Sequence, residues 1–333
     1  MPVFTARQRW FWIVWKNKGG NDLEAFYEEL CKSVTEEGSV LREEPMKNHT
    51  TFRVGGPAEY FVTVTTTEAL QAAVKLCNRY EVPWIVLGNG SNVLVSDAGV
   101  RGVVLRLAGE FTTCDIKEDL FNGNAVAAAG AGMLLSAFAM RLARKGLSGF
   151  EFAAGIPGSV GGAVMMNAGA YGGEVKDCIT QAEIVTAYGE REILSAEQLK
   201  LSYRHSILTE EKGIVTKAWF SFPIGSRLYI FSNIEMLSRR RKEKQPLEYP
   251  SAGSTFKRPE GSFAGKLIME AGLAGKQIGG AAVSEKHCGF VINKDNATAA
   301  DIYTLMQYVI EKVEETSGIR LEPEVKLLGD FSV

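Results

Sequence analysis

The sequence has few of the residues that most often carry metal or nucleophilic chemistry. It contains 333 residues but only three histidines and five cysteines. The cysteines are odd in number and form no CxxC pair, so we expect neither a disulfide framework nor a structural zinc site. The histidines are widely separated and none lies in an HExxH motif. The sequence therefore predicts a protein that binds no metal. It also predicts a location in a reducing compartment, namely the cytoplasm.

A charge excess and a long hydrophobic run are also missing. The net charge of −2 gives no reason to expect a nucleic-acid partner. The N-terminal stretch RQRWFWIVWKNKGG has basic flanks, but its apolar run is too short for a signal peptide or a membrane span. We interpret residues 1–20 as a tail or an overextended start, with a weak membrane or partner contact as the alternative. The basic run at 239–246 is interpreted as a solvated helix end rather than a phosphate track.

The composition and the apolar spacing predict an α+β protein. With 46% hydrophobic and 23% charged residues, the chain is long enough for two or three domains. Apolar spacing predicts helices near residues 21–31 and 134–146, the second ended by Gly146. We expect Thr67 to cap another helix, and Thr298 to open a fourth through a capping box. Residues 181–199 predict a hairpin followed by a short helix, and IRLEPEVKLLG predicts a closing strand.

The segment LGNGSNVLV joins two predicted strands through a loop rich in glycine. Glycines allow positive φ and close approach to a ligand, and successive backbone N–H groups can bind phosphate oxygens. The loop matches neither GxGxxG nor the Walker A motif, so an ordinary tight turn is the alternative to a pyrophosphate site. The candidate cofactor-binding residues in it are Leu87, Gly88, Asn89, Gly90, Ser91 and Asn92.

A second glycine-rich segment, GIPGSVGGAVMMNAGAYGGEV, has almost no charge. So many glycines disfavour a helix or strand, which predicts a long shaped loop against which a large flat ligand such as a dinucleotide packs. A flexible linker is the alternative, but it would expose several apolar side chains. The candidate cofactor-binding residues are Gly155, Ile156, Pro157, Gly158, Ser159, Gly161, Gly162, Asn167, Gly169 and Ala170.

Three separate residues could serve chemistry on a carboxylate-bearing substrate. Arg204 could bind a carboxylate, Glu324 could hydrogen-bond to developing charge, and Ser254 could give a proton to a basic carbon. The alternatives are a surface ion pair, a solvated strand end and a turn residue, respectively. Sequence distance alone does not show that the three residues meet.

Seven ordered motifs between about Pro45 and Gly329 resemble the UDP-N-acetylenolpyruvoylglucosamine reductase family. They are HTTFRVGGPAEYF, LGNGSNVLVSDAGVRGVVLRL, GFEFAAGIPGSVGGAVMMNAGAYGGEVKDC, YRHSIL, KQPLEYPSAGSTFKRPEGSFAGKLI, IGGAAVSEKHCGFVIN and LEPEV. The resemblance implies a three-domain α+β flavoprotein with a vanillyl-alcohol-oxidase-type FAD-binding fold and a C-terminal α+β substrate domain. The implied domains are residues 21–107 completed by 318–333, then 108–244, and then 245–317.

The resemblance also implies the reaction and the roles of the site residues. It implies non-covalent FAD, NADPH as reductant, and reduction of the enolpyruvyl ether of UDP-N-acetylglucosamine to UDP-N-acetylmuramate for peptidoglycan. Hydride would reach C3 from the flavin, Arg204 and Glu324 would stabilise the enol-like intermediate, and Ser254 would protonate C2. The implied substrate-binding residues are Tyr203, Gly253, Lys257 and Arg258.

Two departures from the family pattern and two alternative functions stay open. The segment after Tyr203 lacks the substrate-covering loop of the longer subtype, which places the chain in the shorter subtype and leaves its closure over UDP unknown. Arg258 replaces an asparagine found in some members. The alternatives are an FAD oxidase using dioxygen, which GSTFKRP disfavours, and a nucleotide-sugar or flavin-binding module without turnover. A monomer fits the sequence, but the oligomeric state is open.

Overall fold

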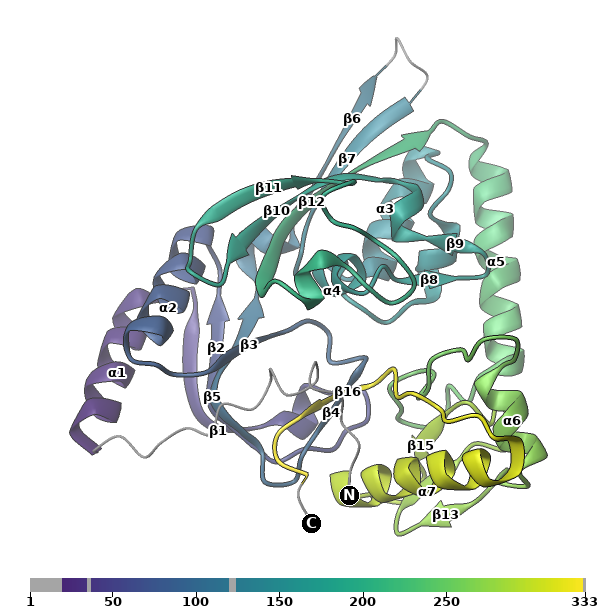
Figure 1. Cartoon of the computed structure of the whole chain (residues 1–333). Coiled ribbons are helices and arrows are strands. Elements are labelled where there is room, and N and C mark those ends of the chain that lie inside the picture. The colour runs from purple at the N-terminus through teal and green to yellow at the C-terminus, as the bar shows by residue number, and fades with distance from the viewer. Residues whose placement is uncertain (1–19, 35–36, 120–123, 332–333) are drawn as a thin grey trace.

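The computed structural model describes residues 20–34, 37–119 and 124–331 (Figure 1). The predicted tail, residues 1–20, lies outside them except for Gly20. The helices are α1 (Gly20–Ser33), α2 (Thr67–Arg79), α3 (Leu135–Lys145), α4 (Val160–Met165), α5 (Arg227–Lys244), α6 (Ala264–Glu270) and α7 (Ala299–Ser317). These helices are combined with three sheets of three or more strands and two strand pairs, so the α+β class is confirmed.

The first sheet has the strand order β1-β2-β5-β3 and is covered on one side by α1 and α2 (Figure 1). Its strands are β1 (Ser39–Pro45), β2 (Pro57–Val64), β3 (Trp84–Leu87) and β5 (Val100–Leu107). β3 and β2 both run parallel to β5, and β1 pairs antiparallel with β2. The first glycine-rich loop therefore leaves the sheet at the carboxyl end of β3, the place where open α/β sheets bind ligands.

The second sheet is antiparallel throughout, in the order β11-β10-β12-β7-β6. Its strands are β6 (Cys114–Asp119), β7 (Asn124–Gly130), β10 (Ile179–Thr186), β11 (Arg191–Ser195) and β12 (Gly213–Pro223). Between β7 and β10 the chain forms α3, α4 and the short pair β8 (Gly169–Ala170) and β9 (Gly173–Glu174). The glycine-rich segment is thus folded into short elements and is not a linker.

The third sheet consists of β13 (Gln277–Ile278), β14 (Ala281–Val283) and β15 (Val291–Asn293), packed against α7. After α7 the chain returns to the N-terminal half, where β16 (Lys326–Leu328) pairs in parallel with β4 (Val93–Val95) (Figure 1). The C-terminal strand therefore completes the region that contains the first glycine-rich loop. The domain boundaries themselves stay predictions.

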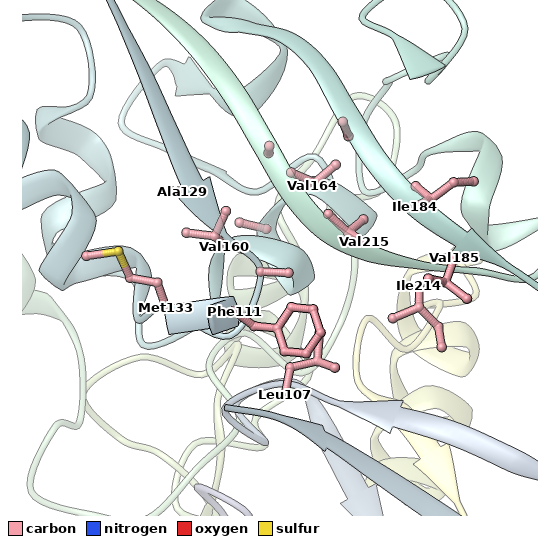
Figure 2. Packing of buried hydrophobic residues seen from close by; sticks show 14 of the residues in the cluster. Leu107, Phe111, Ala129, Met133, Val160, Val164, Ile184, Val185, Ile214 and Val215 are labelled. Carbon is pink, nitrogen blue, oxygen red and sulfur yellow. The ribbon is translucent and has the colours of Figure 1, made fainter. Parts of the chain in front are cut away.

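A single hydrophobic core joins the first two sheets. Leu107 and Phe111 from the end of the first sheet share a buried cluster with Ala129 of β7 and Ile184 of β10 (Figure 2). Phe111 is only 2% exposed, and burying a side chain of its size contributes about 2 kcal/mol. Because this core crosses the predicted boundary at residue 107, the elements on either side of it are held in fixed relative positions.

The helix caps agree with most of the sequence predictions. Gly146 ends α3 at φ 74°, and Thr298 and Asp301 form the expected capping box of α7. The N-cap of α2 is Thr66, not Thr67, because the Thr67 hydroxyl and N–H both donate to Glu110 Oε1. The short helix predicted after the β10–β11 hairpin was wrong. That segment makes only turns and ends at Lys200, whose φ of 46° is not helical.

Two kinds of feature are absent from the described residues. In residues 20–34, 37–119 and 124–331, no group of three or more His, Cys, Asp or Glu side chains is placed to hold a metal ion. No helix in the same ranges is long and apolar enough to cross a membrane.

Candidate active site

A cleft of about 2760 Å³ runs between the first two sheets, α5 and the segments that follow residue 244, here called the C-terminal unit. It is larger than the usual range of about 300–1,000 Å³ for small-molecule pockets, so it has room for a dinucleotide and a second ligand. Most of the predicted cofactor-binding residues line it, namely Leu87, Gly88, Asn89, Gly90, Ser91, Asn92, Gly155, Ile156, Pro157, Gly158, Ser159, Gly162, Gly169 and Ala170. Gly161 and Asn167 do not: Gly161 lies against Ala131, and Asn167 is buried.

The two glycine-rich loops that line this cleft pack against each other. Asn89 Nδ2 donates a hydrogen bond of 2.6 Å to the Pro157 carbonyl. A Cβ added at Gly88 would lie 2.5 Å from Ser159 Oγ, so glycine allows this close approach. The two loops were predicted as separate cofactor-binding segments, whereas in the structure they contact each other and form one continuous part of the cleft lining.

Several backbone N–H groups of these two loops have no acceptor among the described residues. Within the described residues, the N–H groups of Asn89, Gly90, Ser91, Gly158 and Ser159 donate no hydrogen bond. Gly90 is buried and adopts φ 62°, and a Cβ there would lie 1.9 Å from the His49 carbonyl oxygen. Clustered free backbone N–H groups bind phosphate oxygens well. The residues present therefore fit the pyrophosphate of a dinucleotide cofactor.

Arg204 and Glu324 form a mostly buried ion pair that faces the same cleft. Arg204 Nε lies 2.5 Å from Glu324 Oε1, and the side chains are 21% and 12% exposed. Burial raises the pKa of Glu324, while Arg204, Lys257 and Lys326 oppose that rise. The sequence alternatives of a surface ion pair and a solvated strand end therefore do not describe these two residues.

The position of Glu324 is fixed by two segments that meet there. Its backbone N–H donates to the Thr255 carbonyl at 2.8 Å, and its own carbonyl accepts a 3.2 Å bond from Asn92 Nδ2. Thr255 is fully buried, and its hydroxyl accepts a 2.8 Å bond from the Val291 N–H. These contacts join the end of the first glycine-rich loop, the Ser254 segment and the C-terminal strand region.

Ser254 lies beside this junction and lines the cleft. Its hydroxyl makes one hydrogen bond in the structure, a 3.2 Å donation to the Phe256 carbonyl. The preceding residue, Gly253, has φ 75° and open space around it, so the backbone conformation is what requires glycine there. A hydroxyl with a single long bond can turn toward a ligand at little energetic cost.

The other predicted substrate-binding residues are divided between the cleft and its rim. Lys257 lines the cleft, with its ammonium 3.0 Å from Glu322 Oε2. Tyr203 and Arg258 do not line it; they contact each other, since the Arg258 N–H donates to the Tyr203 hydroxyl at 3.1 Å. Both are exposed residues at the edge of the site.

Arg241 on α5 is a cleft residue that sequence analysis missed. It belongs to the basic run interpreted as a solvated helix end, yet burial lowers its pKa and it lines the cleft. Its Nη1 is 3.2 Å from the place where a Cβ on Gly155 would lie. The helical spacing of Ile234, Leu237, Ser238 and Arg241, which all line the cleft, is the signal that could have identified this face.

Comparison with known proteins identifies first the class and then the family. Residues 58–195 match the model of an FAD binding domain, so the α+β fold is that of a flavoprotein. Residues 245–328 match the C-terminal domain of UDP-N-acetylenolpyruvoylglucosamine reductase. The chain is 52% identical over 303 residues to the reductase of that name from Lachnoclostridium phytofermentans, covering 90% of this chain and 96% of the relative. It is 50% identical over 311 residues to that of Agathobacter rectalis, covering 91% and 99%.

A solved structure supports the same conclusion. UDP-N-acetylenolpyruvylglucosamine reductase from Thermus caldophilus superposes with a TM-score of 0.72 at 38% identity, covering 88% of this chain and 99% of that one. The chain belongs to the UDP-N-acetylenolpyruvoylglucosamine reductase family, as the sequence motifs predicted, and is a flavin-dependent oxidoreductase. Its 333 residues fit the shorter subtype.

Proposed function

We propose that this protein reduces the enolpyruvyl ether of UDP-N-acetylglucosamine to UDP-N-acetylmuramate, with FAD as cofactor and NADPH as reductant. The observation that carries the proposal is the mostly buried Arg204–Glu324 pair beside Ser254, in a cleft that the two glycine-rich loops also line. Family membership supports the reaction. The assignment makes the protein an enzyme of peptidoglycan synthesis acting on a UDP-sugar in the cytoplasm.

Arg204, Glu324 and Ser254 each have a distinct task in this reaction. FAD, when bound and reduced by NADPH, would supply the hydride for C3 of the enolpyruvyl group. Arg204 pairs with the substrate carboxylate and, with Glu324, stabilises the negative charge that develops on the enolate. Ser254 then gives its proton to C2, which is basic enough to accept one from a weakly acidic hydroxyl.

Glu324 can stabilise the negative charge of the enolate because of its surroundings. A raised pKa brings its carboxyl closer to the protonated form, which is a hydrogen-bond donor. Arg204 holds the carboxyl in place from one side, and Lys257 contributes positive charge. We further propose that Lys257 contacts an anionic group of the substrate, and that the free N–H groups at Asn89, Gly90 and Ser91 hold the cofactor pyrophosphate.

The proposal is tested by following NADPH oxidation with and without the enolpyruvyl nucleotide, in air and under nitrogen. We expect oxidation that requires the nucleotide, proceeds equally without dioxygen, and yields a product carrying two additional hydrogens by mass spectrometry. Oxygen consumption without the nucleotide would instead indicate the oxidase alternative. Binding of the nucleotide with no product would indicate a module without turnover.

A further inference from the structure

Asn167 is a buried residue of the glycine-rich segment whose amide is occupied by the protein itself. It is 1% exposed. Its Nδ2 donates to Glu174 Oε2 at 2.7 Å and to the Ser202 carbonyl at 3.0 Å, and its Oδ1 accepts from the Lys176 N–H at 2.9 Å. Both amide N–H groups are therefore used, and neither is left for a cofactor.

The Ser202 contact matters because Ser202 opens the turn that carries Arg204. Ser202 and His205 exchange two backbone hydrogen bonds of 3.1 Å, with Tyr203 and Arg204 between them. Arg204 has φ 54°, a left-handed conformation that an arginine seldom adopts. Such a conformation persists only where neighbouring contacts impose it, so the groups that hold Ser202 decide where the guanidinium points.

A second contact fixes the other end of the turn to the same segment. Ser206 is fully buried, and its hydroxyl donates a 2.8 Å hydrogen bond to the Met165 carbonyl. Residues 165–176 thus hold the turn both before and after Arg204. Asn167 itself has φ 42°, a conformation that asparagine tolerates better than most residues.

Glu174 gives the arrangement a further connection to Arg204. Hydrogen bonding from Lys176 is the main influence that holds the pKa of Glu174 below its usual range; Asn167 and the charge of Arg204 act in the same direction, while burial opposes them. Asn167 therefore orients a carboxylate that attracts the guanidinium, besides holding the turn that carries it.

We propose that Asn167 is a positioning residue for Arg204, acting through the Ser202 carbonyl and Glu174, and not a cofactor ligand as the sequence pattern suggested. The inference rests on the proposed function, because Arg204 is given its role there. The direction of the substrate-binding guanidinium therefore depends on one buried amide.

The test is a double-mutant cycle between Asn167→Gly and Arg204→Ala in the full-length protein loaded with FAD. Glycine tolerates the positive φ and removes the side-chain amide together with its β-carbon. We expect Asn167→Gly to lower kcat/KM for the enolpyruvyl nucleotide roughly 100-fold, the scale of a misplaced catalytic group. The rate of FAD reduction by NADPH and the FAD content should stay within about twofold of the wild type.

In the Arg204→Ala background, the same Asn167→Gly change should have less than about a twofold effect, because the residue it positions is absent. Additive losses in the double variant, or an equal loss in FAD reduction by NADPH, would overturn the proposal. If Asn167→Gly does not fold, Asn167→Asp, which keeps the acceptor for the Lys176 N–H, replaces it under the same criteria. A wild type without nucleotide-dependent turnover would contradict the proposed function instead.

Discussion

Arg204 Nε and Glu324 Oε1 lie 2.5 Å apart although 120 positions separate the two residues in the chain. The arginine stands on a tight turn before β12, and the glutamate precedes the C-terminal strand β16. Their meeting requires the chain to return after α7 and pair β16 with β4. The site is therefore assembled only when the whole chain has folded.

Removing the carboxyl group of Glu324 should damage turnover far more than cofactor reduction. We expect Glu324→Ala to lower kcat by about 100- to 1,000-fold, the usual effect of losing one group that stabilises developing charge. The rate of FAD reduction by NADPH should change little, and stopped-flow absorbance measures both half-reactions. Glu315→Ala is the control, since Glu315 is 60% exposed on α7. An equal loss in both half-reactions would contradict the role given to Glu324.

Ser254→Ala tests the proton donor. It should keep FAD reduction by NADPH and lose product formation by at least about 100-fold, because the hydroxyl acts only after hydride reaches C3. Stability should fall by less than about 1 kcal/mol, since the single 3.2 Å bond to Phe256 is weak. Ser262→Ala, in the same segment but outside the cleft lining, provides the comparison. Normal product formation by the Ser254 variant would exclude the acid role.

Arg241→Met tests whether the half-buried cation of α5 binds the cofactor. Because Arg241 lies beside Gly155, we expect the dissociation constant of FAD to rise roughly tenfold, the loss of one charge-assisted hydrogen bond. Equilibrium dialysis or flavin fluorescence measures it. Arg240→Met is a matched control, because Arg240 is exposed on the same helix and lines no part of the cleft. Equal FAD affinity in the two variants would show that Arg241 does not contact the cofactor.

The stability of the C-terminal unit should depend on pH through His287. Burial lowers the pKa of His287 from its ordinary 6.5, and its Nδ1 accepts a 3.1 Å bond from the Gly289 N–H. His287 is therefore protonated more readily in the unfolded chain than in the folded chain. The stabilisation from its neutral form is complete above pH 6.5 and is lost as the pH falls through the lowered pKa.

Denaturant unfolding from about pH 5 to pH 8 checks this prediction. His287→Asn keeps an acceptor near the position of Nδ1 but cannot be protonated in this range, so its free energy of unfolding should vary less with pH than that of the wild type. The same slope in both proteins would contradict the prediction.

Local sequence signals predicted the elements whose causes are local. The capping box at Thr298 and the glycine that ends α3 depend on neighbours within a few residues, and both were predicted correctly. The cap of α2 was misplaced by one residue because Glu110, 43 positions away, takes the Thr67 hydroxyl. Such long-range competition leaves no local pattern.

The site shows the same division between local and distant causes. The glycine-rich loops were predicted as ligand-binding segments, but their packing through Asn89 and Pro157 depends on the tertiary fold. Residue types alone favoured surface roles for Arg204 and Glu324, because nothing local shows that they are buried together. The ordered family motifs supplied that information. Arg241 was missed because it belongs to a basic run that is typical of a solvated helix end, although its position on the helix face turns it toward the cleft.

The flavin absorbance spectrum under nitrogen tests most directly whether this cleft transfers hydride to the enolpyruvyl nucleotide. The purified yellow protein should lose its visible absorbance when NADPH is added in stoichiometric amount. It should regain that absorbance when UDP-N-acetylglucosamine enolpyruvate follows, with UDP-N-acetylmuramate formed in equal amount. A flavin that stays reduced after the nucleotide is added, and recovers only when air is admitted, would contradict the account.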